Sequence, residues 1–99
     1  MHRIAIEPGR VVLSRQGHDC GRFFIVLSVL EDGYVLMADG LTRKMDHPKK
    51  KKCMHLKPKP VCMEAVKENL GKPDFLDAHL RRFLQENGFG VSKALCKED

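Results

Sequence analysis

The chain is short and carries an excess of positive charge. Its 99 residues and formal net charge of +5 fit one domain of ordinary size and exclude two. A core of that size leaves little room to enclose a large group, so no cofactor is expected. No stretch approaches the roughly 18 uninterrupted apolar residues of a membrane span, and the opening MHRIAIEPGR lacks the pattern of a cleaved signal. These features predict a cytoplasmic protein that makes no membrane contact.

The first part of the chain predicts three strands joined by short turns. Residues 11–15 form the first apolar run, and residues 16–21 supply glycines and an aspartate suited to a tight connection. Residues 23–30 are apolar at nearly every position, which is typical of a strand buried on both faces. The Asp-Gly pair within residues 31–33 predicts a hairpin, and residues 34–39 return as the third strand.

Two more strands are predicted in the polar stretch that follows. Residues 42–45 can form a short fourth strand, which Pro48 stops. The lysines at 49–52 are then expected at a loop tip, and residues 53–56 as a fifth strand. Residues 1–57 are therefore predicted to be a mostly β unit, a small closed or nearly closed antiparallel barrel.

Helices are predicted in the remainder, residues 58–99. Pro58 and Pro60 are expected to interrupt the barrel and to begin a proline-rich connection. Apolar residues then recur with helical spacing from 61 to 70, and Gly71 is suited to the helix end. Both predicted helices either pack on the barrel or extend from it.

The second predicted helix has Asp74 as its N-cap and Asp77 at the third helical position. Gly88 stands where a helix would end, and the last eleven residues are expected to be loose. The apolar face of this helix comprises Leu76, Leu80, Phe83 and Leu84.

Four cysteines, at 20, 53, 62 and 96, form no Cys-x-x-Cys pair. An even count could form two disulfides, but the expected compartment is reducing, which favours free thiols. A zinc site built from His47, Cys53, His55 and Cys62 is the alternative, since these are the right ligand types. Their spacing matches no common zinc pattern and four lysines lie among them, so no metal is expected.

The positive charge is concentrated in one window. Residues 41–60 hold eight basic residues and one acidic residue, a net charge of +7, whereas the other residues hold ten basic and twelve acidic, a net charge of −2. This distribution is typical of a surface that attracts phosphate groups. The alternatives are a solvated, mutually repelling lysine run that serves solubility and a signal similar to those for nuclear localisation. The basic residues are Arg43, Lys44, Lys49, Lys50, Lys51, Lys52, Lys57 and Lys59.

The loop between the first two strands is a second candidate contact. Gly17 and Gly21 are expected to leave their amides uncovered, so that a phosphate or ribose can approach. Arg15 and Arg22 flank the loop and offer paired donors. The alternative is that both glycines only make the turn. Tyr34, beside the predicted hairpin, is the one plausible exposed platform for a base.

The stretch GRVVLSRQGHDCGRFFIVLSVLEDGYVLMADG, a strand, glycine loop, strand and hairpin, resembles the KOW motif of ribosomal and transcription-associated RNA-binding proteins. With the continuation LTRKMDHPKKKKCMHLK, it is similar to the small bacterial KOW-domain proteins related to archaeal and eukaryotic large-subunit ribosomal proteins. The resemblance covers residues 9–57. It implies an SH3-like antiparallel β-barrel, RNA binding, and RNA contacts in the first loop, at Arg15, Gln16, Gly17, His18, Gly21 and Arg22.

The expected function is that of a non-catalytic RNA-binding protein, associated with the ribosome or its assembly and hence with translation. Its partner is expected to be RNA, ribosomal RNA above all, with ribosomal proteins as further partners. The histidines have no recognisable catalytic partner, so no enzyme is predicted. The alternative is an adaptor that binds a protein through the barrel or the helical tail. The full predicted site is Arg15, Gln16, Gly17, His18, Gly21, Arg22, Arg43, Lys44, Lys49, Lys50, Lys51, Lys52 and Lys57.

Overall fold

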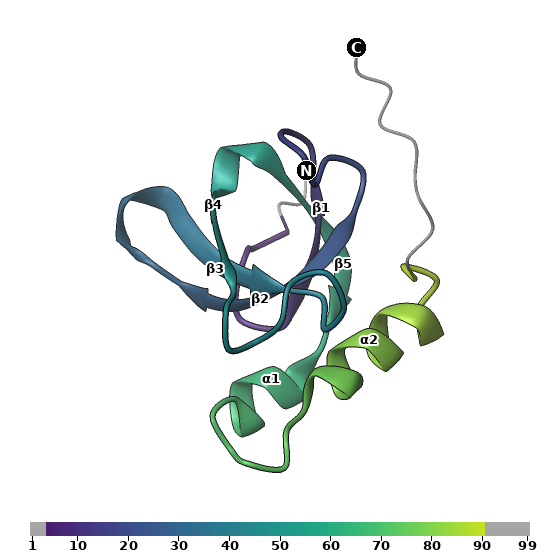
Figure 1. Ribbon diagram of the computed structural model, residues 1–99. Coiled ribbons are helices and arrows are strands. Elements are labelled where there is room, and N and C mark those ends of the chain that lie inside the picture. Colours follow the sequence, from purple (N-terminus) through teal and green to yellow (C-terminus); the bar gives the residue numbers. More distant parts are fainter. Residues whose placement is uncertain (1–3, 91–99) are drawn as a thin grey trace.

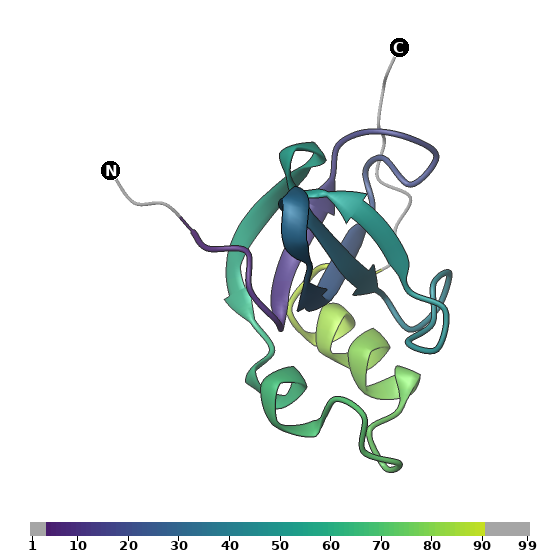
Figure 2. The ribbon, with the colours of Figure 1, turned by 90° about the vertical axis from the view of Figure 1, so that its left-hand side faces the viewer.

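The computed structural model describes residues 4–90 and contains a five-stranded antiparallel sheet with two short helices. The strand order is β4-β3-β2-β1-β5, and both helices lie against one side of the sheet (Figures 1 and 2). The fold is mostly β, as predicted. The elements are β1 (Arg10–Ser14), β2 (Phe23–Val29), η1 (Glu31–Gly33), β3 (Tyr34–Ala38), β4 (Lys49–Lys52), η2 (Cys53–His55), β5 (Leu56–Cys62), α1 (Glu64–Asn69) and α2 (Asp77–Glu86).

Strand β2 lies at the centre of the sheet and is buried on both faces, which confirms the prediction from its apolar run. Because side chains alternate along a strand, its residues divide between two clusters. Ile25 and Leu27 join the cluster that also contains buried residues of the helical part, such as Leu80. Phe24 and Val26 join the second cluster, on the opposite face.

The predicted hairpin between β2 and β3 is present. Asp32 and Gly33 have φ values of 63° and 77°, the left-handed conformation that an Asp-Gly pair readily adopts. Leu30 closes the turn by donating its N–H to the Tyr34 carbonyl at 2.8 Å. The sequence therefore predicted both the position and the chemistry of this turn.

The lysine run is a strand, not the predicted loop tip. Residues 49–52 form β4, which pairs with β3 from Met37↔Lys49 to Tyr34↔Lys52. Lysine has a low β propensity, but its aliphatic stem can cover apolar surface while its charge stays in water. Charged lysines also suit an edge strand, because they discourage pairing with another chain.

Residues 42–45 form a loop, so the predicted fourth strand there is wrong. The buried Asp39 carboxylate organises this segment: its Oδ1 accepts hydrogen bonds from the N–H groups of Leu41, Thr42 and Arg43 at 3.0, 2.9 and 2.8 Å. Its Oδ2 accepts a fourth, from the Thr42 hydroxyl at 2.7 Å. These local bonds occupy the amides that a strand would have offered to a neighbour.

The last strand begins later and extends further than predicted. Residues 53–55 form a single 3₁₀ turn, and β5 runs from Leu56 to Cys62 with Pro58 and Pro60 inside it. The prolines therefore do not end the sheet, and the predicted junction at 57/58 falls within a strand. Within residues 4–90, strand β5 pairs only with β1, and an edge strand tolerates residues without an N–H donor.

Helix α2 begins two residues later than an Asp74 cap would require. Its N-cap residue is Leu76, whose N–H donates to Nδ1 of His79 at 2.9 Å. The predicted apolar face is confirmed in part: Leu80 and Leu84 are buried in the core, whereas Leu76 is exposed. The face of α2 is therefore largely used in packing against the sheet.

The end of α2 forms the predicted glycine cap. Gly88 has a φ of +83°, and its N–H donates to the Gln85 carbonyl at 3.2 Å. The Phe89 N–H reaches back to the Leu84 carbonyl at 2.7 Å, which completes a Schellman motif. Phe89 then packs on Phe23 with ring centroids 4.7 Å apart. The predicted loose end falls mostly at residues 91–99, outside the described residues.

Cys53 and Cys62 are free thiols, as expected, whereas Cys20 is disulfide-bonded, which the sequence did not lead us to predict. Burial raises the pKa of the Cys62 thiol, which donates to the Pro8 carbonyl at 3.6 Å. Neither α1 nor α2 has the length and apolar character needed to cross a membrane, and the same holds for all helical segments between residues 4 and 90.

Candidate functional site

The four lysines of β4 point to two different faces, because successive side chains alternate along a strand. Lys49 and Lys51 share the face of the buried Val35 and Met37 and are themselves half-buried. The other two lysines are exposed on the opposite face. One basic run therefore supplies two separate surfaces.

Lys51 is committed to contacts within the protein. Its Nζ lies 2.9 Å from Oδ1 of Asp19 and donates to the Gln16 carbonyl at 2.6 Å. The same Asp19 oxygen accepts the Ser14 hydroxyl at 2.8 Å. With side chains only 10% and 15% exposed, Lys51 and Asp19 fasten the β1–β2 loop, residues 15–22, to β4.

Asp19 stays ionised in this setting. Burial raises the pKa of its carboxyl, but hydrogen bonds from Lys51 and Ser14 lower it, as do the charges of Lys51 and Lys49. The lowering effects prevail, so the pKa lies below its ordinary value of 3.8. The loop therefore keeps a fixed negative charge among the cations at neutral pH.

The glycines of the β1–β2 loop serve its geometry. Gly17 has a φ of +87°, and a Cβ there would lie 3.2 Å from the Nζ of Lys51. Gly21 has a φ of +89°, and its N–H donates to the Ser14 carbonyl at 2.8 Å. The expectation that both amides are uncovered is therefore wrong for Gly21, whose donor closes the hairpin.

Three segments meet around a shallow hollow of about 200 Å³. The β1–β2 loop contributes Arg22, the β3–β4 loop contributes Arg43, and β4 contributes Lys49. Within residues 4–90, no ion pair commits any of these three cations to a carboxylate. We call this the basic hollow. Its polar lining residues are His18, Asp19, Arg22, Thr42, Arg43 and Lys49.

Helix α2 holds the β3–β4 loop, residues 39–48, in place at two points. Arg81 donates from Nη1 to the Gly40 carbonyl at 2.8 Å, and Asp77 accepts the Met45 N–H at 2.7 Å. The helix approaches Gly40 so closely that a Cβ there would overlap the Asp77 carbonyl oxygen. Arg43 is therefore presented by a loop that is fixed internally by Asp39 and externally by α2.

Sequence reasoning missed these supporting residues. Asp39 could have been found, because Asp39-Gly40 followed by Thr42 matches the local pattern in which an aspartate caps nearby amides. Asp77 and Arg81 gave no comparable signal, since their partners lie 32 and 41 residues away in the sequence.

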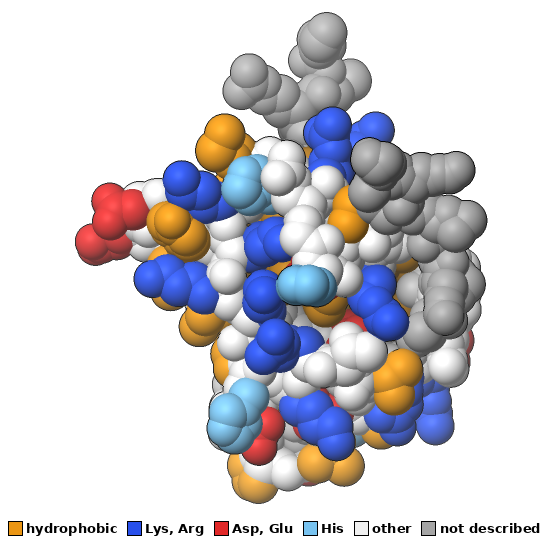
Figure 3. All heavy atoms as spheres, turned by 45° about the horizontal axis from the view of Figure 1, so that its top comes forward, with side chains coloured by type: hydrophobic (Ala, Val, Ile, Leu, Met, Phe, Trp, Pro, Cys, Tyr) orange, Lys and Arg blue, Asp and Glu red, His pale blue; other side chains and the backbone are white. Residues whose placement is uncertain are grey.

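The remaining predicted residues lie outside the lining of the basic hollow. Arg15, Lys44 and Lys57 are exposed, and Gln16 contributes its carbonyl to Lys51. Figure 3 shows Lys and Arg side chains gathered over this face with histidines among them, while acidic side chains are few. Of the predicted residues, His18, Arg22, Arg43 and Lys49 therefore line the hollow, and the other predicted cations lie outside its lining.

On the opposite face of β4, Lys50 and Lys52 lie beside Tyr34. Their Nζ atoms are 4.9 and 5.8 Å from the centroid of the tyrosine ring. Both distances fall within the range in which a cation is attracted to an aromatic face. Tyr34 is partly exposed, so the predicted platform is flanked by charge.

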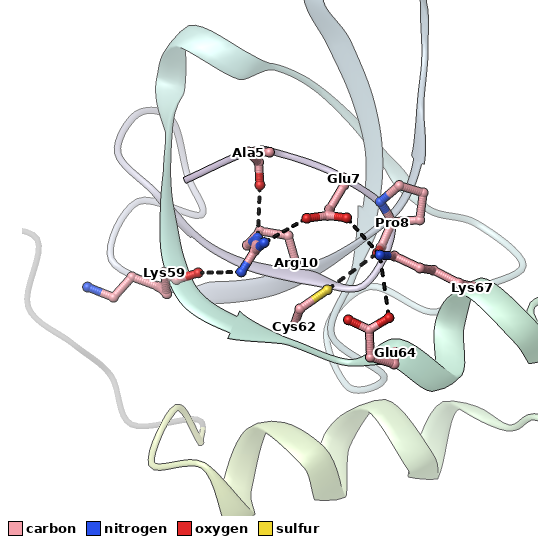
Figure 4. Close-up of polar contacts among 8 residues, drawn as sticks. All are labelled: Ala5, Glu7, Pro8, Arg10, Lys59, Cys62, Glu64 and Lys67. Atoms are coloured by element: carbon pink, nitrogen blue, oxygen red, sulfur yellow. Dashed lines mark hydrogen bonds and ion pairs between the residues drawn. The ribbon is translucent and has the colours of Figure 1, made fainter. Parts of the chain in front are cut away.

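A second ionic cluster lies at the start of β1 (Figure 4). Glu7 accepts from Arg10 and from Lys67, each at 2.7 Å, and Lys67 lies 3.4 Å from Glu64. The Lys67 hydrogen bond, then that of Arg10, lowers the pKa of Glu7. Two carboxylates here balance two cations, so little positive charge is left for a ligand.

The side chains of the basic hollow suit a phosphate group. An arginine can donate two parallel N–H bonds to phosphate oxygens, and a lysine adds a compact charge. Among residues 4–90, no three His, Cys, Asp or Glu side chains are grouped to hold a metal ion, so the zinc alternative gains no support. No protein-family model matches the sequence, and no curated protein is significantly similar to it.

Proposed function

We propose that the protein is a non-catalytic RNA-binding protein that holds the phosphate backbone in the basic hollow. The observation that carries this proposal is the convergence of Arg22, Arg43 and Lys49 from three separate segments, with no carboxylate of residues 4–90 in an ion pair with any of them. Phosphate contacts of this kind position a protein on a nucleic acid without reading its sequence. Exposed cations outside the hollow, such as Lys44 beside Arg43 in the sequence, extend the contact along the nucleic-acid strand.

The KOW resemblance supports RNA over other polyanions, and ribosomal RNA in particular. The glycine loop that carries the resemblance also contributes His18 and Arg22 to the hollow. An SH3-like barrel is part of the proposal. It is supported by the order of the antiparallel strands, by burial on both faces of β2, and by the single 3₁₀ turn that joins the edge strands β4 and β5.

An adaptor that uses its helical tail is the weaker candidate. A partner would have to dock on the apolar face of α2. However, Leu80 and Leu84 of that face are buried in a core cluster, and Phe83 packs against that cluster. Only Leu76 of that face is exposed. A single exposed apolar side chain is ordinary on a protein surface and does not indicate a docking site.

The salt dependence of RNA affinity tests the proposal. If about five phosphates are neutralised, the logarithm of affinity should fall against the logarithm of salt with a slope of about −4.5 on duplex or about −3.5 on single strands. Arg43→Glu with Lys49→Glu should weaken binding about 100-fold and make the slope shallower by about two.

The matched control places the same charge change elsewhere. Lys72 and Arg82 are exposed residues of the helical part, and neither lines the basic hollow. Lys72→Glu with Arg82→Glu should leave most of the affinity and nearly the original slope. Equal losses in the two double variants would reject the hollow as the site.

The ribosomal part of the proposal needs a separate experiment. Crosslinking the protein to RNA in cells, followed by sequencing of the attached fragments, should recover ribosomal RNA from one defined region. If the recovered fragments come from many unrelated RNAs, the ribosomal part of the proposal is wrong and RNA binding itself still stands.

A further inference from the structure

Tyr34 is set apart from the other aromatic residues. Phe24 is part of one hydrophobic core cluster, and the phenylalanines at 23, 75, 83 and 89 pack against the other. Tyr34 belongs to neither cluster. It stands directly opposite Lys52 in the β3–β4 pairing, and Lys50 is its diagonal neighbour on the same face. The ring is therefore a partly exposed apolar surface with two ammonium groups close to it.

The two lysines beside the ring have no carboxylate partner among the described residues. No ion pair involves Lys50 or Lys52 in the part of the chain from residue 4 to 90. As residues two apart in one strand, they carry like charges on the same side. Lysines on an edge strand can serve to prevent pairing with another chain, which would account for Lys50 and Lys52. That role does not require an aromatic ring beside them.

We propose that this face binds one unpaired nucleotide of a single-stranded RNA segment, with its base stacked on Tyr34. This inference rests on the proposed function and adds a second contact, on the other face of β4 from the basic hollow. Lys50 and Lys52 move from the ring to the flanking phosphates. Base stacking on an aromatic side chain is tolerant of sequence, whereas a duplex keeps its bases stacked on one another.

The chain provides its own reporter for this contact. It contains one tyrosine and no tryptophan, so its intrinsic fluorescence comes from Tyr34. Titration of the wild-type protein with a single-stranded oligouridylate should quench this fluorescence. A duplex of the same length, and inorganic polyphosphate, should bind through charge and leave the emission largely unchanged.

Two substitutions at position 34 give an independent measurement by anisotropy of labelled oligouridylate. Tyr34→Phe keeps the ring and should bind like the wild type, whereas Tyr34→Leu keeps apolar bulk but should bind about tenfold more weakly. Duplex affinity, which depends on the hollow, should be the same in both variants.

Four outcomes would overturn the inference. If oligouridylate binds without quenching, or if Tyr34→Leu binds it as well as Tyr34→Phe does, the ring is not a stacking platform, while RNA binding through the hollow still stands. Quenching by polyphosphate equal to that by oligouridylate would likewise assign the signal to charge alone. If neither RNA binds the wild type, both this inference and the proposed function fail.

Discussion

The two ends of strand β1 carry ionic clusters that differ in balance. At its start, Glu7 and Glu64 face Arg10 and Lys67, so negative and positive groups are equal in number. At its end, Asp19 is the one carboxylate in a lining that also contains two arginines and a lysine. We therefore expect anion binding to depend on the cations that no described carboxylate pairs with, and not on the number of lysines alone.

The clusters also differ in their exposure to solvent. The Lys67–Glu7 side chains are 37% and 33% exposed, whereas those of the Lys51–Asp19 pair are 10% and 15% exposed. Exposed pairs contribute little to stability and are screened by salt, while partly buried pairs are screened less. The Asp19 cluster should therefore matter for both folding and binding, and the Glu7 cluster mainly for attaching the N-terminal segment.

Asp19→Asn should have the largest effect on stability. Replacing the charge leaves the Lys51 ammonium half-buried without its counter-ion, and we expect a loss of about 2 kcal/mol in the free energy of unfolding. RNA affinity should rise a few-fold, because a negative charge leaves the basic hollow. Urea unfolding and RNA titration of the same variant measure the two effects.

The control for this variant is Asp32→Asn in the β2–β3 hairpin. Asp32 is exposed and has a φ of 63°, a conformation that asparagine also tolerates. Neither stability nor RNA affinity should change appreciably. If Asp19→Asn binds RNA more weakly than this control does, the prediction that the negative charge of Asp19 repels phosphate is wrong.

Gly17→Ala should have the next largest effect. A left-handed backbone conformation costs a residue with a side chain about 1–2 kcal/mol. Gly33→Ala has the same backbone strain, with a φ of +77°, but no atom within 4 Å of the added carbon. The excess loss in Gly17→Ala therefore measures the disturbance of Lys51, and equal losses from urea unfolding would show that the lysine adjusts freely.

Acid should destabilise the protein through both clusters. The pKa values of Asp19 and Glu7 lie below their ordinary values of 3.8 and 4.5 in the folded state, so the unfolded chain takes up protons first as the pH falls. The two carboxylates contribute fully to the free energy of unfolding at pH values above their ordinary pKa. This contribution is lost as the pH falls through the lower pKa of the folded state. Asp19→Asn should flatten stability against pH below about 3.8, and Glu7→Gln below about 4.5.

The smallest expected effect is that of Glu7→Gln at neutral pH. Its loss of stability should be clear at low ionic strength and should fade at high salt, because the pair is exposed. RNA affinity should stay unchanged, since Glu7 does not line the hollow. Glu68→Gln, an exposed residue of α1 outside the ionic clusters, is the matched control. A loss of stability that persists at high salt would contradict this prediction. It would show that salt screens the Glu7 ion pairs as little as it screens the Lys51–Asp19 pair.

The sequence predicted correctly those elements that are determined by residues close together in the chain. The apolar run of β2, the Asp-Gly turn before β3 and the glycine cap of α2 depend on neighbouring residues, and all three are present. Strand β4 was missed because nothing in four consecutive lysines indicates a strand. It forms because β3 offers an unpaired edge, which is a property of the sheet and not of residues 49–52.

The structure brings some of the predicted site residues together, and their arrangement within the site could not be predicted from the sequence. The sequence pointed to the glycine loop and the lysine run, but alternation along β4 became visible only once that run was known to be a strand. The pairing of Lys51 with Asp19 spans 32 residues, and no local pattern encodes it. Whether RNA binds this face remains a prediction that the experiments above test.

The close approach of α2 to Gly40 has a consequence for the order of events during synthesis. Chains emerge from the N-terminus, so all five strands are made before Asp77 and Arg81, the residues that hold the β3–β4 loop. A nascent chain that ends before residue 81 therefore lacks the helix that fixes the position of Arg43. Full affinity for a polyanion should arise late in translation, after the sheet has formed.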